Sequence, residues 1–295
     1  MGFSQDQFKG CLLGLAIGDA LGAPHEGGII ERCVWRLIGR THDGLARWTD
    51  DTQMALDLAE SLLVQGGLIE QDLATRFARS YSWSRGYGPG TARLLRRIRR
   101  GQEWASAARA IYPQGSYGNG AAMRSPVLAL FFIHDFEALI RTTRASAQVT
   151  HAHPLGIAGA ILIAAATHAL LCRGSLEDVI STVRTHCQAP DMLARLNIAW
   201  SWLAENVAPT PREVSARLGN GMTAVTSCVT ALYIALRYIN CDFNEMMLFI
   251  IACRGDVDTV GAMAGALWGV FNGSIGLPSI ALEGRSLLED MALQI

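Results

Sequence analysis

The side chains best suited to chemistry form two clusters of acidic and hydroxyl residues near opposite ends of the sequence. The first is Thr49-Asp50-Asp51, and the second comprises Asp256, Asp258 and Thr259. Each cluster leads into an apolar, helix-like segment, so taken alone either one is open to interpretation as a helix cap. A cap needs only one carboxylate, however, and two adjacent carboxylates repel each other unless a cation is bound. The repeated pattern therefore favours a metal site.

The ligand types indicate the metals such a site would take. Together the clusters supply four carboxylates and two hydroxyls. Hard oxygen ligands of this kind select Mg²⁺, Mn²⁺ or Ca²⁺ over zinc. Four carboxylates would over-neutralise one divalent ion and suit two, which can orient substrate oxygens and activate a water. The sequence thus predicts two metal ions and a hydrolytic reaction.

A glycine-bearing loop, Gly18–Gly28, carries a third candidate acid. Glu26 is placed there for acid–base work, although a surface glutamate is the plainer interpretation of this residue alone. Asp19, at the start of the same loop, is either a helix cap or a member of the metal network.

The segment Gly115–Arg124 has three glycines within six residues, more than a helix cap requires. Their backbone amides could form an anion nest at the start of the next helix, suited to a diphosphate. Tyr112 and Tyr117 offer flat faces for a base. Two histidines follow, His151 and His153; with an all-oxygen ligand set elsewhere, His151 is interpreted as a neutral hydrogen-bonding partner of a ligand, and a structural role stays open for both.

Helical periodicity dominates the elements that must position these residues. Apolar residues recur at helical spacing around residues 8–16, 54–62 and 73–81, and the basic run Arg93–Arg100 is expected to be a solvated helix face. Further helices are predicted for residues 155–171, 175–187, 190–206, 223–239, 242–252 and 259–271. No segment alternates strictly enough for a strand. We predict an all-α fold in one domain, residues 1–295, whose small apolar residues let helices pack closely.

The composition excludes several classes of function. The chain has 295 residues, half of them apolar, and a net charge of −1, so no global field holds nucleic acid or an anionic membrane. Seven cysteines without a C-x-x-C pair predict buried free thiols in a reducing compartment. The N-terminus shows no secretory pattern, and residues 155–171 are expected to be a buried core helix. A cytoplasmic monomer is the expectation.

Five motifs together resemble the ADP-ribosylglycohydrolase family. They are G-C-L-L-G-L-A-I-G-D-A-L-G at residues 10–22, W-T-D-D-T-x-M-A at 48–55, G-N-G-A-A-M-R at 118–124, T-H at 150–151 and G-D-V-D-T-V-G-A-M-A-G-A at 255–266. They occur in the family's order and cover nearly the whole chain. Within the family the sequence is most similar to the ADP-ribosylserine hydrolase branch, as judged from residues 76–78, 85–90, 115–120, 146–151 and 218–221.

This resemblance implies an orthogonal helical bundle with a binuclear Mg²⁺ site, or Mn²⁺, in a central cleft. The implied metal ligands are Thr49, Asp50, Asp51, Asp256, Asp258 and Thr259, and the implied catalytic residues are Glu26, Asp51 and Asp258. The implied substrate-binding residues are Gly86, Gly88, Gly90, Tyr112, Gly115, Ser116, Tyr117, Gly118, Asn119, His151, Asn220 and Met222. The substrate would be an ADP-ribosylated protein or a small molecule that contains ADP-ribose.

Two positions depart from the family pattern Gly-Gly-Asp-Thr-Asp-Thr. Arg254 replaces the first glycine and Val257 replaces the middle threonine. The valine removes a hydroxyl that could support a metal ligand or a water, which would change metal affinity or substrate choice. Three alternatives to a serine-specific hydrolase therefore stay open: an ADP-ribosylarginine hydrolase, a non-catalytic ADP-ribose-binding or structural protein, and a phosphohydrolase acting on the diphosphate.

Overall fold

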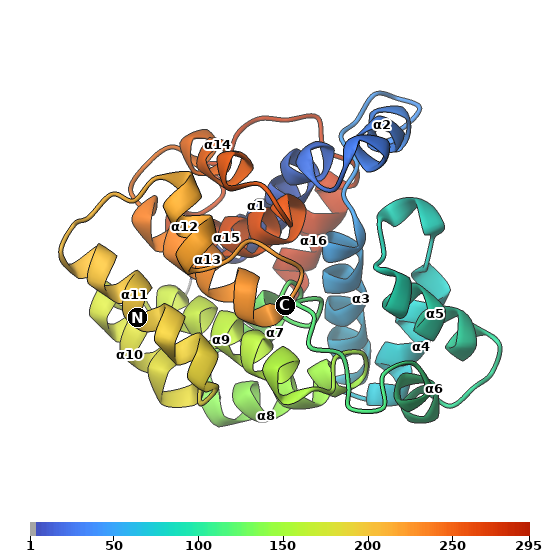
Figure 1. Ribbon diagram of the computed structural model, residues 1–295. Helices are drawn as coiled ribbons and strands as arrows, with labels where there is room; N and C mark the ends of the chain where they lie inside the picture. The colour runs from blue at the N-terminus through green and yellow to red at the C-terminus, as the bar shows by residue number, and fades with distance from the viewer. Residues whose placement is uncertain (1–3) are drawn as a thin grey trace.

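Sixteen α-helices and two short 3-10 helices make up the computed structural model, which describes residues 4–295 (Figure 1). The α-helices are α1 (Gln5–Gly22), α2 (Ile29–Ile38), α3 (Asp50–Gln65), α4 (Glu70–Ser80), α5 (Pro89–Arg99), α6 (Trp104–Ile111), α7 (Pro126–Phe131), α8 (Phe136–Gln148), α9 (Pro154–Leu171), α10 (Leu176–His186), α11 (Pro190–Ala204), α12 (Pro211–Arg217), α13 (Ala224–Arg237), α14 (Phe243–Cys253), α15 (Val257–Asn272) and α16 (Arg285–Gln294). Within this described part of the chain, β-pairing is confined to three isolated bridges. The predicted all-α fold is confirmed.

Helices α1 and α15 form the central pair, and glycines let their backbones touch. Glycines spaced four residues apart share one face of each helix. A Cβ atom on Gly14 would lie only 2.2 Å from the carbonyl oxygen of Gly265, and one on Gly18 would lie 2.1 Å from that of Gly261. This confirms the predicted close packing through small residues. Because the helices run antiparallel, the end of α1 lies beside the start of α15, and the residues flanking these two ends meet.

Helix α9 lies below this pair in the view of Figure 1 and packs against α8, α10, α13 and α15. Its mean hydropathy over 18 residues is 1.8, and 78% of those residues are buried. Among the helices of residues 4–295 it alone is long and apolar enough to match a membrane span by length and composition. Its burial fits the predicted core helix.

Helices α3 to α6 form a second group beside the central pair, with α3 packed on α1 and α4. In α5, Leu94, Leu95 and Ile98 are buried, whereas all five arginines between residues 93 and 100 are exposed. The prediction of a solvated basic face is confirmed.

Three expectations need correction. The segment Gly18–Gly28 was expected to be a loop, but α1 continues through Gly22 and Ala23–His25 form a 3-10 helix. All seven cysteines are free, as predicted, but Cys33, Cys172 and Cys241 are exposed rather than buried. The segment after Gly120 also does not start a helix directly: turns cover residues 120–125, and α7 begins only at Pro126. Proline lacks an amide hydrogen and is tolerated at the first position of a helix, which sets this later start.

Candidate metal centre and substrate cleft

A cleft of about 310 Å³ opens between α3, the start of α15 and the loops around them. Its floor carries Asp50, Asp51, Asp256 and Asp258. The remaining wall residues are Glu26, Met54, Gly86, Gly88, Pro89, Gly90, Thr91, Tyr112, Ser116, Tyr117, Gly118, Asn119, Gly120, Met123, His151, Met222, Thr223 and Thr259. The volume lies in the usual range for small-molecule sites.

The first cluster is held by its own helix and by Asp19. Thr49 is the N-cap of α3, and its hydroxyl accepts a hydrogen bond from the Asp51 amide. Asp19, fully buried at the end of α1, accepts the amide hydrogens of Thr49 (3.0 Å) and Thr52 (3.1 Å). Asp19 therefore provides hydrogen-bond acceptors for amides at the start of α3 that would otherwise be unpaired. Of its two predicted roles, the structure shows the capping one.

The second cluster depends on residues far away in sequence. Asp256 is the N-cap of α15 but makes no capping hydrogen bond with its side chain. Its carboxylate instead accepts a hydrogen bond from the Asn119 side chain, and its amide donates to the Asn220 carbonyl at 2.9 Å. Asp258 sits in the first turn of α15 and accepts the Thr259 amide at 2.8 Å.

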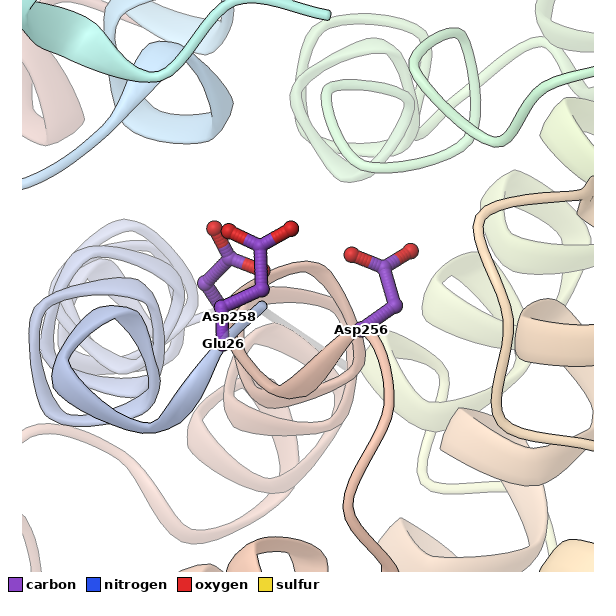
Figure 2. A group of neighbouring side chains, drawn as sticks. All are labelled: Glu26, Asp256 and Asp258. Carbon is purple, nitrogen blue, oxygen red and sulfur yellow. The ribbon is translucent and has the colours of Figure 1, made fainter. Parts of the chain in front are cut away.

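Glu26 and both clusters converge. Oxygen atoms of Glu26, Asp256 and Asp258 all lie within 4.8 Å of one another, with their carboxylates pointing to the same side (Figure 2). The Thr259 hydroxyl donates to Asp51 at 3.4 Å, which links the second cluster to the first. The fold thus gathers acidic groups that are more than two hundred residues apart in the chain.

The electrostatics of this centre fit bound cations. Burial, together with neighbouring carboxylates, raises the pKa of Asp51 and of Asp258 well above the ordinary value for aspartate. The Oδ1 atom of Asp51 is buried without a hydrogen-bond partner. The cleft is lined by no lysine or arginine from the described residues. Divalent cations would offset the repulsion and supply the missing partner.

His151 is a neutral hydrogen-bond donor at the cleft wall. Burial and the nearby Arg124 lower its pKa to about 3. Arg124 donates to the Thr150 hydroxyl (2.9 Å), whose own hydrogen can then reach Nδ1 of His151 (2.7 Å). This assignment leaves Nε2 protonated beside Gly118 and Gly120. His153, by contrast, caps α9 through Nδ1 and is not among the cleft-lining residues.

Glycines shape the opposite wall of the cleft and the cavity that adjoins it. The Tyr112 ring lies directly on Gly90, where a Cβ atom would come within 2.2 Å of the phenol oxygen. Gly115 has φ +84°, and a Cβ atom there would meet the His153 amide at 2.2 Å. Only glycine allows both the positive φ and this close approach. The segment is also fixed by an antiparallel bridge between Gly118 and Thr223.

Most of the predicted substrate-binding residues line the cleft, and two do not. Gly115 borders an adjoining cavity instead, and Asn220 supports the second cluster from behind. Met54, Thr91 and Thr223 also line the cleft and were not predicted from the sequence as wall residues. Met54 lies three residues beyond Asp51 in α3, and this helical spacing could have predicted that both face the cleft. No sequence pattern predicts the same for Thr91 or Thr223.

Comparison with known proteins decides the relationship. The family model of ADP-ribosylglycohydrolase matches residues 3–295. The chain belongs to the ADP-ribosylglycohydrolase family. It is 33% identical to the ADP-ribosylhydrolase ARH3 of Bos taurus and 32% identical to that of Homo sapiens, over 93% of this chain and 87% and 88% of those proteins. A solved structure described as an ADP-ribosylglycohydrolase-related protein complex matches 98% of this chain and 96% of its own, with a TM-score of 0.71 and 28% identity.

The two departures from the family pattern occupy different environments. Val257 is 1% exposed, and its side chain belongs to the hydrophobic core. Arg254 follows α14 and is exposed, with φ +60°. A non-glycine residue is strained in that conformation, which a glycine would adopt freely.

Proposed function

We propose that the protein is a metal-dependent hydrolase that cleaves the bond between C1″ of ADP-ribose and an acceptor, releasing ADP-ribose. The convergence of Glu26 with both acidic clusters in one cleft carries this proposal. Serine on a protein is the proposed acceptor because residues 85–90 and 115–120 follow the pattern of that branch of the family. A small molecule that contains ADP-ribose is a second kind of substrate for the same site.

The donor set suits two Mg²⁺ ions, with Mn²⁺ as a substitute. Thr49, Asp50, Asp51, Asp256, Asp258 and Thr259 would hold them. When bound, such ions orient substrate hydroxyls and lower the pKa of a water. Side chains and backbone amides of the protein would transfer the proton and bind the rest of the substrate. Because the acidic residues occupy one end of the cleft, the diphosphate and the base would lie at the other end.

Glu26 is the proposed proton carrier. Its side chain is half-buried, and burial raises the pKa of the carboxyl group. As the leaving oxygen departs from the ribose, Glu26 would either protonate that oxygen or take a proton from the attacking water. At the far end, Nε2 of His151 and the amides of residues 116–118 would donate to the diphosphate, and Tyr112 and Tyr117 would flank the base.

One assay tests the proposal. Serine-linked, arginine-linked and acetyl-ester ADP-ribose substrates are incubated with Mg²⁺, with Mn²⁺ and with EDTA, and released ADP-ribose is quantified. We expect release from the serine-linked substrate, and its loss in EDTA. Release from arginine alone would overturn the acceptor, and AMP with ribose phosphate as products would identify a phosphohydrolase.

A second candidate is a non-catalytic ADP-ribose-binding protein. The strained Arg254 beside the second cluster favours it, since arginine lacks the backbone freedom of the glycine in the family pattern. Calorimetry separates the two candidates: tight binding of ADP-ribose without turnover of any of the three substrates supports the binding protein.

A further inference from the structure

A buried carboxylate that the proposed reaction does not use lies on the helix of the first cluster. Asp57, on α3 and six residues beyond Asp51, is 6% exposed. It accepts a hydrogen bond from the Gln53 amide group at 3.1 Å and another from the hydroxyl of Ser80, the last residue of α4. Asp57 therefore joins α3 to the end of α4, from which the polypeptide leads into the Gly86–Gly88 loop that precedes α5.

Within that loop, Tyr87 stands between two glycines that line the cleft. Its ring is buried and meets Tyr81 edge-to-face, with centroids 5.0 Å apart. Its hydroxyl is shielded from solvent and has no hydrogen-bond partner among the described residues. Burial raises the pKa of this phenol; the Asp57 carboxylate lies near enough to raise it further, and the Ser80 hydroxyl lies near enough to lower it. A buried hydroxyl without a partner is costly, which points to a partner close by.

The available hydrogens allow one arrangement. An ionised Asp57 only accepts, so Ser80 commits its single hydrogen to that carboxylate. The Ser80 oxygen keeps a lone pair, and the Tyr87 hydroxyl has a hydrogen to donate. A small movement of the loop would complete a chain from Tyr87 through Ser80 to Asp57. The charge at the end of such a chain strengthens each of its hydrogen bonds.

We propose that Asp57 is a positioning residue that acts through Ser80 and Tyr87 to fix the Gly86–Gly88 loop against α3 when substrate occupies the cleft. This inference rests on the proposed function for the identity of the substrate. Gly86 faces the first cluster, since a Cβ atom there would lie 3.7 Å from the side chains of both Thr49 and Asp50. Fixing the loop would hold the ribose end of the substrate over that cluster. Loss of this contact would therefore weaken substrate binding.

The strength of the hydrogen bonds from Tyr87 through Ser80 to Asp57 would also depend on pH. Burial raises the pKa of Asp57 to about 7; Glu60 on the same helix raises it further, whereas Arg76 on α4 lowers it. Below pH 7 the carboxyl group becomes neutral and loses its charge-assisted bond. Ser80 can then turn its hydrogen toward the Phe77 carbonyl, 3.4 Å away. The loop would therefore be held more firmly above pH 7 than below it.

Three variants test the proposal: Asp57→Asn and Tyr87→Phe break the chain, and Ser61→Ala is the matched control. Ser61 is a fully buried hydroxyl on the same helix that donates to Asp72 of α4 at 2.7 Å, away from the loop. We expect KM for ADP-ribosylserine peptide to rise about five- to tenfold in the first two variants with kcat within twofold. Ser61→Ala should lower Tm comparably and leave KM unchanged.

Two further measurements separate positioning from simple stability. The ratio of KM between Asp57→Asn and the wild type should grow as pH rises from 6 to 8. Amide hydrogen exchange of residues 82–90 with ADP-ribose bound should be faster in Asp57→Asn and Tyr87→Phe than in Ser61→Ala. Equal exchange and equal KM in all three variants overturn the inference. Faster loop exchange in a protein that binds ADP-ribose but releases none supports it and contradicts the proposed hydrolysis instead.

Discussion

In the first acidic cluster, the Thr49 hydroxyl caps its own helix and Asp19 pairs with the first-turn amides. In the second, Asp256 leaves its helix uncapped and is held by Asn119 and Asn220, more than 30 residues away in sequence. The two clusters have nearly the same composition, yet the first has a side-chain cap on its own helix together with acceptors from Asp19, 30 to 33 residues away, whereas the second has no side-chain cap and relies on the two asparagines alone. Two segments of similar sequence can thus be held in one site by different sets of hydrogen bonds.

The largest expected effect follows from treating both clusters as one centre. Asp51→Asn and Asp258→Asn should each lower kcat/KM for ADP-ribose release at least about 1000-fold, since each removes a charge that the metals require. Steady-state kinetics at saturating Mg²⁺ measure this, with the exposed Asp290→Asn as control. Full turnover in either variant would show that the clusters do not act together.

The close approach of the central helix pair, which positions residues of both clusters, should make an added side-chain atom costly. Gly265→Ala places a Cβ atom 2.1 Å from the Gly14 carbonyl oxygen and should lower the free energy of unfolding by about 3 kcal/mol. Gly67→Ala, where the added atom meets nothing within 4 Å, is the control and should change stability little. Urea denaturation measures both. A near-neutral Gly265→Ala would mean that the helices can separate without cost.

Metal affinity directly compares the residue that holds the second cluster, Asn119, with the residue that holds the first, Asp19. Asn119→Ala removes the side-chain partner of Asp256 and should weaken Mn²⁺ binding about 30-fold, or about 2 kcal/mol. Thr52→Val removes one hydrogen bond to Asp19, but the Thr49 and Thr52 amides still donate, so a smaller loss is expected. Calorimetric titration with Mn²⁺ measures both; a larger loss in Thr52→Val would reverse the comparison.

The helix of the first cluster should also give the metal-free protein a pH-dependent stability. The pKa of Asp57 is raised by folding from its ordinary value near 3.8 to about 7. Folding therefore favours its protonated form, and that stabilisation is lost as pH rises toward 7. Between pH 5 and 6.5 in EDTA, the free energy of unfolding of wild type should fall relative to Asp57→Asn by about 1.4 kcal/mol per pH unit. Parallel curves would contradict the raised pKa.

The smallest effect concerns the departure at Val257. Val257→Thr places a hydroxyl in the core and should lower stability by about 1 kcal/mol while leaving Mn²⁺ affinity within threefold. Tenfold tighter Mn²⁺ binding in this variant would show instead that the valine weakens the second cluster.

Part of this site could be predicted from local patterns. The helix starts at Asp50 and Val257 follow from a hydroxyl or carboxylate placed before an apolar periodic segment. Other parts could not. Arg124 and Thr150 set the tautomer of His151 through hydrogen bonds that span 26 residues, and no periodicity reports such a pairing. Asn220 was expected in the cleft, but its carbonyl is turned toward the Asp256 amide.

The sequence by itself determined the helical class, the acidic composition of the site and, through glycines four residues apart, a face on α1 and on α15 flat enough for close packing. These properties are local, because they depend on period, side-chain size and charge. Only the tertiary structure decided that Gly18 opposes Gly261, which brings Glu26 and Asp258 together at one end of the pair. This pairing of α1 with α15 depends on burial and hydrogen bonding summed over the whole chain. No single segment of the sequence contains that information.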